Sequence, residues 1–227
     1  MIKGVVFDLD HTLFDRYSTL RKIAPAMIEG FGDKISCGVD AEKFADALVS
    51  ADKKHIHFGF EKVIEYLYKA GIFKNPISVE EYTEVLYKNF AKVAVPFSFT
   101  ESVLEKLLEQ GYKLGLITNG RSKIQSAKIG LLGIEKYFDE IIISGDLGIH
   151  KPDRRIFDIF AKKINLNPCE MLYVGDNPVN DVDASRKAGY IPVWVKTTGE
   201  WLFPEIERCR YEIDTVEELP DLLNKIR

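Results

Sequence analysis

The chain has 227 residues, of which 31 are Lys or Arg and 35 are Asp or Glu, so its formal net charge is −4. Hydrophobic residues make up 46% and charged residues 29%, a composition that excludes a disordered chain and predicts an ordinary globular core. A mildly acidic chain lacks the basic surface that binds nucleic acid. No apolar run approaches the roughly 20 residues that cross a bilayer. We therefore expect neither nucleic acid nor a membrane as a partner.

The cysteines and the first residues bear on the compartment. Cys37, Cys169 and Cys209 are odd in number and far apart, with no C-x-x-C pair. The chain turns acidic at Asp8 directly after its first apolar run, which is not the pattern of a secretory signal peptide. Both features predict a reduced, cytoplasmic location.

Short apolar runs recur along the chain, and most of them end in polar residues. They cover residues 4–7, 114–117, 141–143, 171–174 and 191–195. Runs that are apolar throughout, rather than alternating, are typical of strands whose two sheet faces are both covered by helices. We predict five buried strands.

Helical patterns separate the later runs. Thr100 is predicted to cap a helix that stops at Gly111, and Ile124, Ala127 and Leu131 recur at helical spacing in the next segment. Further helical patterns occupy residues 156–164, 181–188 and, in the tail, 216–226. Alternation of strand and helix predicts an α/β fold, a Rossmann-like parallel sheet with helices on both faces.

Residues 15–95 interrupt this alternation. Apolar side chains recur there only at helical spacing, and Ser78 with Glu81 forms the pattern of a helix capping box. A helical insert of this length exceeds any loop, so we predict a small helical domain at 15–95. The α/β core is then formed by residues 1–14 and 96–227.

Polar side chains gather where the predicted strands end. Open parallel sheets bind ligands at the carboxyl ends of their strands, so these residues share one edge. They are Asp8, Asp10, Thr118, Asn119, Ser144, Asp146, Asp176 and Asp181.

Four of these carboxylates, those of Asp8, Asp10, Asp176 and Asp181, would repel one another, and this repulsion has to be compensated. A like-charge pair about 4 Å apart costs on the order of 4 kcal/mol at an effective dielectric constant near 20. Either the pKa values of these groups rise or a cation lies among them. Mg²⁺ prefers such oxygen ligands, and Lys151 supplies a positive charge near the third strand end.

Each of these residues also has a purely structural interpretation. A strand-end Asp is often a turn former or a helix cap, Thr118 and Asn119 fit a helix entry, and Lys151 before Pro152 fits a solvated lysine. Their placement at one edge of the same sheet favours a functional site.

The chain resembles the haloacid dehalogenase superfamily, in the branch of phosphatases with a helical cap inserted after the first strand. The first motif of that family, D-x-D-x-T/V, matches Asp8-Leu9-Asp10-His11-Thr12, and the second, a Thr or Ser ending a strand, matches Thr118-Asn119. The third, a Lys often followed by Pro, matches Lys151-Pro152. The fourth, G-D-x-x-x-x-D, matches the segment from Gly175 to Asp181. One departure is Arg154, where many relatives carry a small residue or Pro, and we expect it on a helix surface.

The resemblance implies roles for these residues. Asp8 would be the nucleophile that forms an aspartyl-phosphate, and Asp10 would act as general acid and then general base. Thr118, Lys151 and the backbone near Asn119 would bind phosphate. Mg²⁺ would be bound by the metal-site residues Asp8, Asp10 (through its backbone carbonyl), Asp176 and Asp181. The implied activity is hydrolysis of a small phosphorylated metabolite, and 15–95 is the implied cap.

Other functions fit the same motifs less well. A haloacid dehalogenase lacks the second Asp of the first motif, so Asp10 argues against it. A phosphomutase would keep all four motifs. From a different class, a phospho-accepting receiver module is much shorter and has no acid/base Asp two residues after its phosphorylated Asp. The substrate itself and the oligomeric state are not predicted, although the resemblance leans toward nucleoside monophosphates, sugar phosphates, phosphoglycolate or acylneuraminate 9-phosphate.

Overall fold

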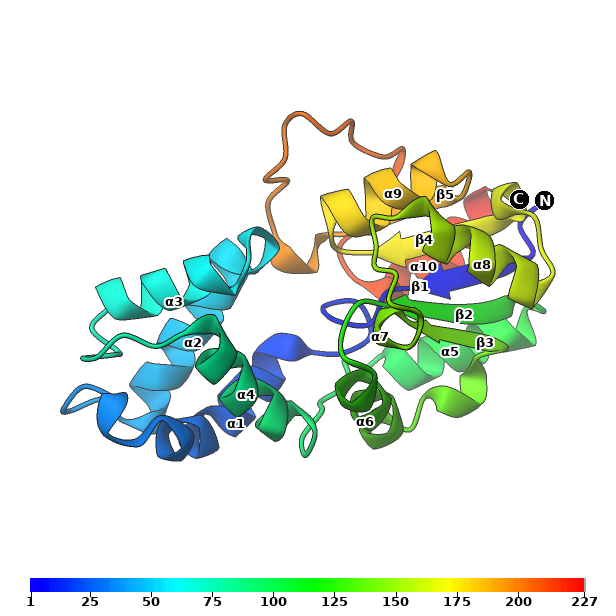
Figure 1. Ribbon diagram of the computed structural model, residues 1–227. Helices are drawn as coiled ribbons and strands as arrows, with labels where there is room; N and C mark the ends of the chain where they lie inside the picture. Colours follow the sequence, from blue (N-terminus) through cyan, green and yellow to red (C-terminus); the bar gives the residue numbers. More distant parts are fainter. Residues whose placement is uncertain (227) are drawn as a thin grey trace. The chain divides into compact units, whose positions relative to one another are not determined.

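The computed structural model describes residues 1–226 and divides into two compact units. One unit joins Met1–Asp15 to the chain from Pro96 onward, and the other is Arg16–Val95 (Figure 1). Asp15 therefore lies with the first unit. Within residues 1–226, no helix is both long enough and apolar enough to cross a membrane.

The first unit is built on a parallel sheet. Its strands in the described part of the chain are β1 (Gly4–Phe7), β2 (Lys113–Thr118), β3 (Glu140–Ile143), β4 (Met171–Gly175), β5 (Ile191–Val195) and β6 (Tyr211–Ile213). Their order is β3-β2-β1-β4-β5-β6, and every neighbouring pair is parallel. The predicted fold class and five predicted strands are confirmed, and β6 was not predicted.

Helices lie on both faces of this sheet (Figure 1). On one face, α5 (Thr100–Glu109) packs against β2 and against α10 (Leu219–Lys225). On the other, α8 (Arg154–Ile164) packs against β2, β3 and α9 (Ala184–Lys187). Within the described residues of this unit, the other α-helices are α6 (Ser122–Leu132) and α7 (Ser144–Leu147), and a π-helical turn at Pro178–Asp183 precedes α9. The order in which the chain crosses the sheet brings the ends of β1, β2 and β4 side by side.

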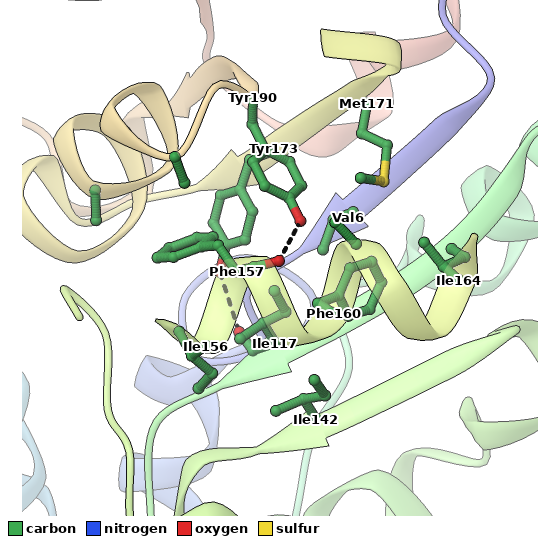
Figure 2. Packing of buried hydrophobic residues seen from close by; sticks show 13 residues of the cluster. Val6, Ile117, Ile142, Ile156, Phe157, Phe160, Ile164, Met171, Tyr173 and Tyr190 are labelled. Carbon is green, nitrogen blue, oxygen red and sulfur yellow. Dashed lines mark hydrogen bonds between the residues drawn. The ribbon is translucent and has the colours of Figure 1, made fainter. Parts of the chain in front are cut away.

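A hydrophobic cluster fills the space between α8 and the sheet. Phe157 and Phe160 of α8 pack on strand residues that include Val6 and Ile117, and all four are fully buried (Figure 2). Gly115 leaves room for this packing, because a Cβ there would lie 2.0 Å from the Phe160 ring. Burying an aromatic side chain of this size contributes about 1.5–3 kcal/mol. The cluster thus fixes the strands whose ends carry the polar residues.

Two helix predictions in this unit need correction. Thr100 does not cap α5, because the N-cap residue is Phe99 and the Thr100 hydroxyl donates to the Leu13 carbonyl over 3.0 Å. In α6 the inward face is Gln125, Lys128 and Ile129, whereas Leu131 of the predicted apolar pattern is 48% exposed. The polar side chains Gln125 and Lys128 of α6 face inward because they form hydrogen bonds with groups inside this unit.

The second unit is helical. Its α-helices are α1 (Arg16–Phe31), α2 (Ala41–His55), α3 (Phe60–Lys69) and α4 (Val79–Phe90). The Ser78 hydroxyl accepts a hydrogen bond from the Glu81 backbone N–H over 3.1 Å, as the capping pattern predicted. Phe31, Phe73 and Tyr82 pack ring against ring in the core.

A buried ion pair joins α1 to α2 in this second unit. The Arg16 guanidinium donates to both Asp52 oxygens through Nε, at 3.1 and 2.9 Å, and its second nitrogen lies 2.8 Å from Oδ2. The face of the Phe90 ring lies 5.1 Å from the guanidinium carbon. Within the helical unit, the buried positive charge of Arg16 is therefore paired with the negative charge of Asp52 in a good hydrogen-bonding geometry.

Candidate active site

The candidate active site lies at the carboxyl ends of the central strands. Asp8 follows β1, Thr118 is the last residue of β2, and Asp176 follows β4. Phe7 pairs with Leu116 on one side and with Val174 on the other, and the Asp8 N–H donates to the Val174 carbonyl over 2.9 Å. This register places residues far apart in sequence at one sheet edge.

Three carboxylates meet at this edge. One oxygen from each of Asp8, Asp176 and Asp181 lies within 4.8 Å of the other two, and all three residues are buried. We call this group the acidic cluster. It unites three of the five aspartates predicted at the strand ends, while the carboxylate of Asp10 has other partners.

Lys151 completes the acidic cluster. Its ammonium nitrogen lies 2.7 Å from Asp8 Oδ1, 2.7 Å from Asp181 Oδ1 and 2.9 Å from the Tyr173 hydroxyl. An ammonium has three N–H donors, and these contacts supply three acceptors. Lys151 is therefore fixed in a buried position by its hydrogen bonds.

The electrostatics of the cluster follow from burial. Burial is the main cause that raises the pKa of Asp8 to about 7, and Lys151 opposes it. Burial also raises the pKa of Asp176 well above its ordinary value, reinforced by the charges of Asp181 and Asp8. Burial works against the charged form of Lys151, but Asp181 and Asp8 outweigh it and raise the pKa of its ammonium. The single lysine is charged and does not neutralise the three carboxylates.

Tyr173 links the cluster to the hydrophobic core and was not singled out from the sequence. Its hydroxyl donates to the Ile117 carbonyl over 3.1 Å (Figure 2). The same hydroxyl accepts from Lys151. Burial raises the pKa of Tyr173 well above its usual value, so the hydroxyl keeps its proton. The available signal was a tyrosine inside an otherwise apolar buried strand.

The orientation of Asp181 depends on the turn after β4. The Asn177 backbone N–H donates to Asp181 Oδ2 over 3.0 Å, while Oδ1 accepts from Lys151. Gly175 makes room for this carboxylate, because a Cβ at Gly175 would lie 2.5 Å from Asp181 Oδ2. The glycine of the fourth motif therefore serves a steric purpose in this structure, because it leaves space for the Asp181 carboxylate.

Asn119 holds the backbone of Lys151. Its side-chain amide donates to the Lys151 carbonyl over 2.8 Å and accepts from the Lys151 N–H over 2.9 Å. Nearby, the buried Ser144 hydroxyl accepts from the Gly120 N–H over 3.0 Å. The Asn119 side chain is therefore occupied with positioning Lys151, which leaves its backbone N–H as the group to consider for phosphate.

The Asp10 side chain has partners of its own on α6. Lys128 donates to both of its carboxylate oxygens, at 2.7 and 2.9 Å, and Gln125 donates to Oδ2 over 3.1 Å. The Gln125 amide also lies 2.5 Å from the Thr118 hydroxyl. Gln125 and Lys128 were not singled out from the sequence, although they lie three residues apart, on one face of the helix that follows Thr118.

Two residues named from the sequence lie apart from these contacts. Asp146, predicted at the third strand end, is exposed. Arg154 is exposed on α8 and lies 3.4 Å from Asp158, one helical turn away. Arg154 therefore lies on a helix surface, as expected.

The acidic cluster fits a divalent cation. Its donor atoms are carboxylate oxygens, which Mg²⁺ prefers, and one oxygen of each residue lies within 4.8 Å of the other two. The three buried carboxylates also exceed the one positive charge of Lys151, so a cation would relieve their repulsion. Asp8 and Asp176 are the ligands that fit best, since both oxygens of Asp181 already accept hydrogen bonds.

Comparison with known proteins identifies the family. The model of the haloacid dehalogenase-like hydrolases matches residues 5–195, a span that includes every residue of the site described above. The chain belongs to the haloacid dehalogenase-like hydrolase family. The resemblance inferred from the four sequence motifs is confirmed.

Curated relatives of this family member are named phosphatases. The glyceraldehyde 3-phosphate phosphatase of Methanocaldococcus jannaschii is 30% identical, over 100% of this chain and 99% of the relative. The glyceraldehyde 3-phosphate phosphatase of Pyrococcus abyssi is 34% identical, over 100% of this chain and 94% of the relative. Both alignments span the α/β core and the helical insert.

A solved structure supports the fold. A putative HAD-hydrolase from Bacillus subtilis, bound to magnesium, superposes with a TM-score of 0.74 and covers 98% of this chain and 99% of that chain. The two sequences are 22% identical, so this likeness establishes the architecture of the hydrolase family member described here.

Proposed function

We propose that this protein is a Mg²⁺-dependent phosphatase that hydrolyses a small phosphate monoester through a phosphorylated Asp8. The observation that carries the proposal is the acidic cluster with Lys151 between Asp8 and Asp181. Family membership and the phosphatase relatives support the same reaction class.

In the first step, a carboxylate oxygen of Asp8 attacks phosphorus, and the bond to the leaving oxygen breaks. Asp10 gives its proton to that oxygen as it leaves, so the alcohol departs neutral. The product is an aspartyl-phosphate on Asp8, which divides one difficult hydrolysis into two easier steps.

In the second step, water attacks the phosphorus of the aspartyl-phosphate. Asp10, now a carboxylate, takes the proton of that water, and Asp8 is released together with inorganic phosphate. Asp10 returns to its protonated form, so the cycle closes with one water consumed and no net change in the enzyme.

The phosphoryl oxygens need fixed positive groups in both steps. We assign the Thr118 hydroxyl and the backbone N–H of Asn119 to them as donors, and the Lys151 ammonium, whose three N–H groups already have acceptors, as a nearby positive charge. Donors held rigidly before the reaction stabilise developing charge without reorganisation. The contacts of Lys151 with Asp8, Asp181 and Tyr173 provide that rigidity.

Asp8 and Asp176 would hold Mg²⁺, with the Asp10 carbonyl as a further ligand and Asp181 as a ligand or orienting residue. The ion supplies charge that offsets the repulsion between an anionic nucleophile and an anionic phosphate. Asp181 is held by Lys151 and Asn177, which suits the orienting role.

The helical unit, Arg16–Val95, is the cap in this proposal, and it contributes substrate specificity. Both curated relatives above are named for glyceraldehyde 3-phosphate, so a triose phosphate is the first substrate to test. Sugar phosphates, nucleoside monophosphates, phosphoglycolate and acylneuraminate 9-phosphate complete the panel.

The test is a steady-state assay of purified protein with this panel and p-nitrophenyl phosphate. We expect many turnovers per enzyme with Mg²⁺, no turnover in EDTA, and recovery of turnover when Mg²⁺ is added back. A single stoichiometric phosphorylation would indicate a receiver-like module. Full activity in EDTA would contradict the role assigned to the acidic cluster.

A further inference from the structure

The site contains a second buried lysine that the four family motifs do not include. Lys128, on α6, is a buried residue whose ammonium points at Asp10 rather than at the acidic cluster. Its nitrogen also lies 4.6 Å from the centre of the Phe14 ring. A lysine is rarely buried unless its charge has a partner, and the Asp10 carboxylate provides one.

Lys128 and Gln125 act on Asp10 as a pair. Lys128 contacts both carboxylate oxygens, which fixes the plane of the group, and Gln125 ties Oδ2 to the Thr118 hydroxyl. Gly120 permits the approach of Gln125, because a Cβ there would lie 2.8 Å from Gln125 Cγ. Asp10 is thereby held in register with the end of β2.

This arrangement restricts the rotation of the Asp10 carboxyl group. Its Oδ1 accepts from Lys128, and its Oδ2 accepts from both Lys128 and Gln125. The hydrogen bonds from α6 therefore hold the side chain in one orientation. A misplacement of about 1 Å in a catalytic group costs on the order of 100-fold in rate.

We propose that Lys128, assisted by Gln125, is a positioning residue that aims the Asp10 carboxyl at the leaving oxygen of the substrate. The inference rests on the proposed phosphatase function and on the acid role of Asp10. According to this inference, α6 is part of the active site, because it connects the general acid Asp10 with the phosphate-binding end of β2.

The leaving group distinguishes positioning from general structural support. p-Nitrophenolate departs without a proton, whereas the alkoxide of glyceraldehyde 3-phosphate needs one from Asp10. Lys128→Met should lower kcat/KM for glyceraldehyde 3-phosphate about 100-fold and for p-nitrophenyl phosphate less than about tenfold. Lys123→Met, at an exposed position of the same helix, is the matched control and should leave both values unchanged.

A double-mutant cycle with Asp10→Asn sharpens the test. Once the acid is gone, Lys128→Met should no longer change the ratio of the two kcat/KM values, because both substitutions act through one group. An equal loss for both substrates in Lys128→Met, or a further change of the ratio in the Asp10→Asn background, overturns the inference.

Gln125→Met keeps the inference testable if Lys128→Met fails to fold. It should shift the same ratio in the same direction by up to about tenfold, since one neutral hydrogen bond to Asp10 is lost. An unchanged ratio in folded Gln125→Met overturns the inference while leaving the phosphatase function intact. Wild-type protein that hydrolyses neither ester with Mg²⁺ contradicts the proposed function itself.

Discussion

The two units of the chain each bury charged side chains, but they balance them differently. In the helical unit, Arg16 and Asp52 form an ion pair in which both carboxylate oxygens accept hydrogen bonds. At the sheet edge, three carboxylates share the single cation of Lys151. A balanced buried pair serves the packing around it, whereas a group of buried carboxylates around one lysine is suited to binding a cation. Burial is the main cause that raises the pKa of Asp8 to about 7, and the charges of Asp181 and Asp10 add to it.

The largest effect is expected at the unbalanced site. Asp8→Asn replaces the nucleophile by a neutral amide, and we expect kcat to fall by at least about 10⁴-fold, the scale seen when a catalytic nucleophile is removed. The measurement is turnover of the best substrate of the panel by purified variant, with a thermal melt as the folding control. Near-normal turnover would rule out the assigned nucleophile.

The balanced pair should respond in stability. Arg16→Met leaves the buried Asp52 carboxylate without its bidentate partner, and we expect the free energy of unfolding to fall by about 3–5 kcal/mol. Urea unfolding measures this loss. The double variant Arg16→Met/Asp52→Leu should recover a large part of it, because an apolar pair of similar size replaces two buried charges. A single variant as stable as the wild type would remove the contrast between the two units.

Gly175 tests the steric fit of Asp181. A methyl group at this position would collide with the Asp181 carboxylate, so Gly175→Ala should displace it from Lys151. We expect Mg²⁺ to bind about 10–100-fold more weakly, as is typical when a residue that orients a metal ligand is disturbed. Calorimetry measures the affinity. Gly130→Ala is the matched control, because a Cβ there meets no atom within 4 Å.

A smaller effect is expected in the pH dependence of the folding stability, which should reflect the raised pKa of Asp8. Because burial raises the pKa of Asp8 from 3.8 to about 7, folded metal-free protein binds more protons than unfolded protein in this range. Its stability therefore falls as pH rises from about 4 to 7. The pKa values of Glu65 and Glu170, lowered to about 2 mainly by hydrogen bonds from Lys69 and Lys3, matter only below pH 5.

Mg²⁺ should offset this loss, so its stabilising effect should be a few degrees in Tm at pH 8 and smaller at pH 5. The measurement is a thermal melt with and without Mg²⁺ at both values. Asp8→Asn should show a flatter profile in the absence of metal. An effect of Mg²⁺ that is equal at both pH values would argue against binding by the acidic cluster.

The sequence was informative wherever a polar residue directly follows an apolar strand. Asp8, Thr118 and Asp176 were placed from strand ends alone, since parallel strands bring their carboxyl ends to one edge. The four ordered motifs then added Lys151 and Asp181.

Other contacts could not be predicted because their partners are distant in the chain. Lys128 lies more than a hundred residues from Asp10, and a helix pattern with Ile124 and Leu131 favoured a different buried face. A tyrosine within an apolar strand predicts core packing, which hid the contact of Tyr173 with Lys151. Burial of these polar groups follows from their hydrogen bonds, and periodicity of apolar residues carries no information about those.

Direct titration of Mg²⁺ into wild-type protein and Asp176→Asn at pH 7.5 tests the central claim most sharply. The account predicts one Mg²⁺ per wild-type chain and binding more than about 100-fold weaker in the variant, while Asp158→Asn, at a partly exposed position on α8, binds like the wild type. Wild-type protein that binds no Mg²⁺, or a variant that binds it equally well, would contradict the claim that the excess of buried carboxylates exists to hold a cation.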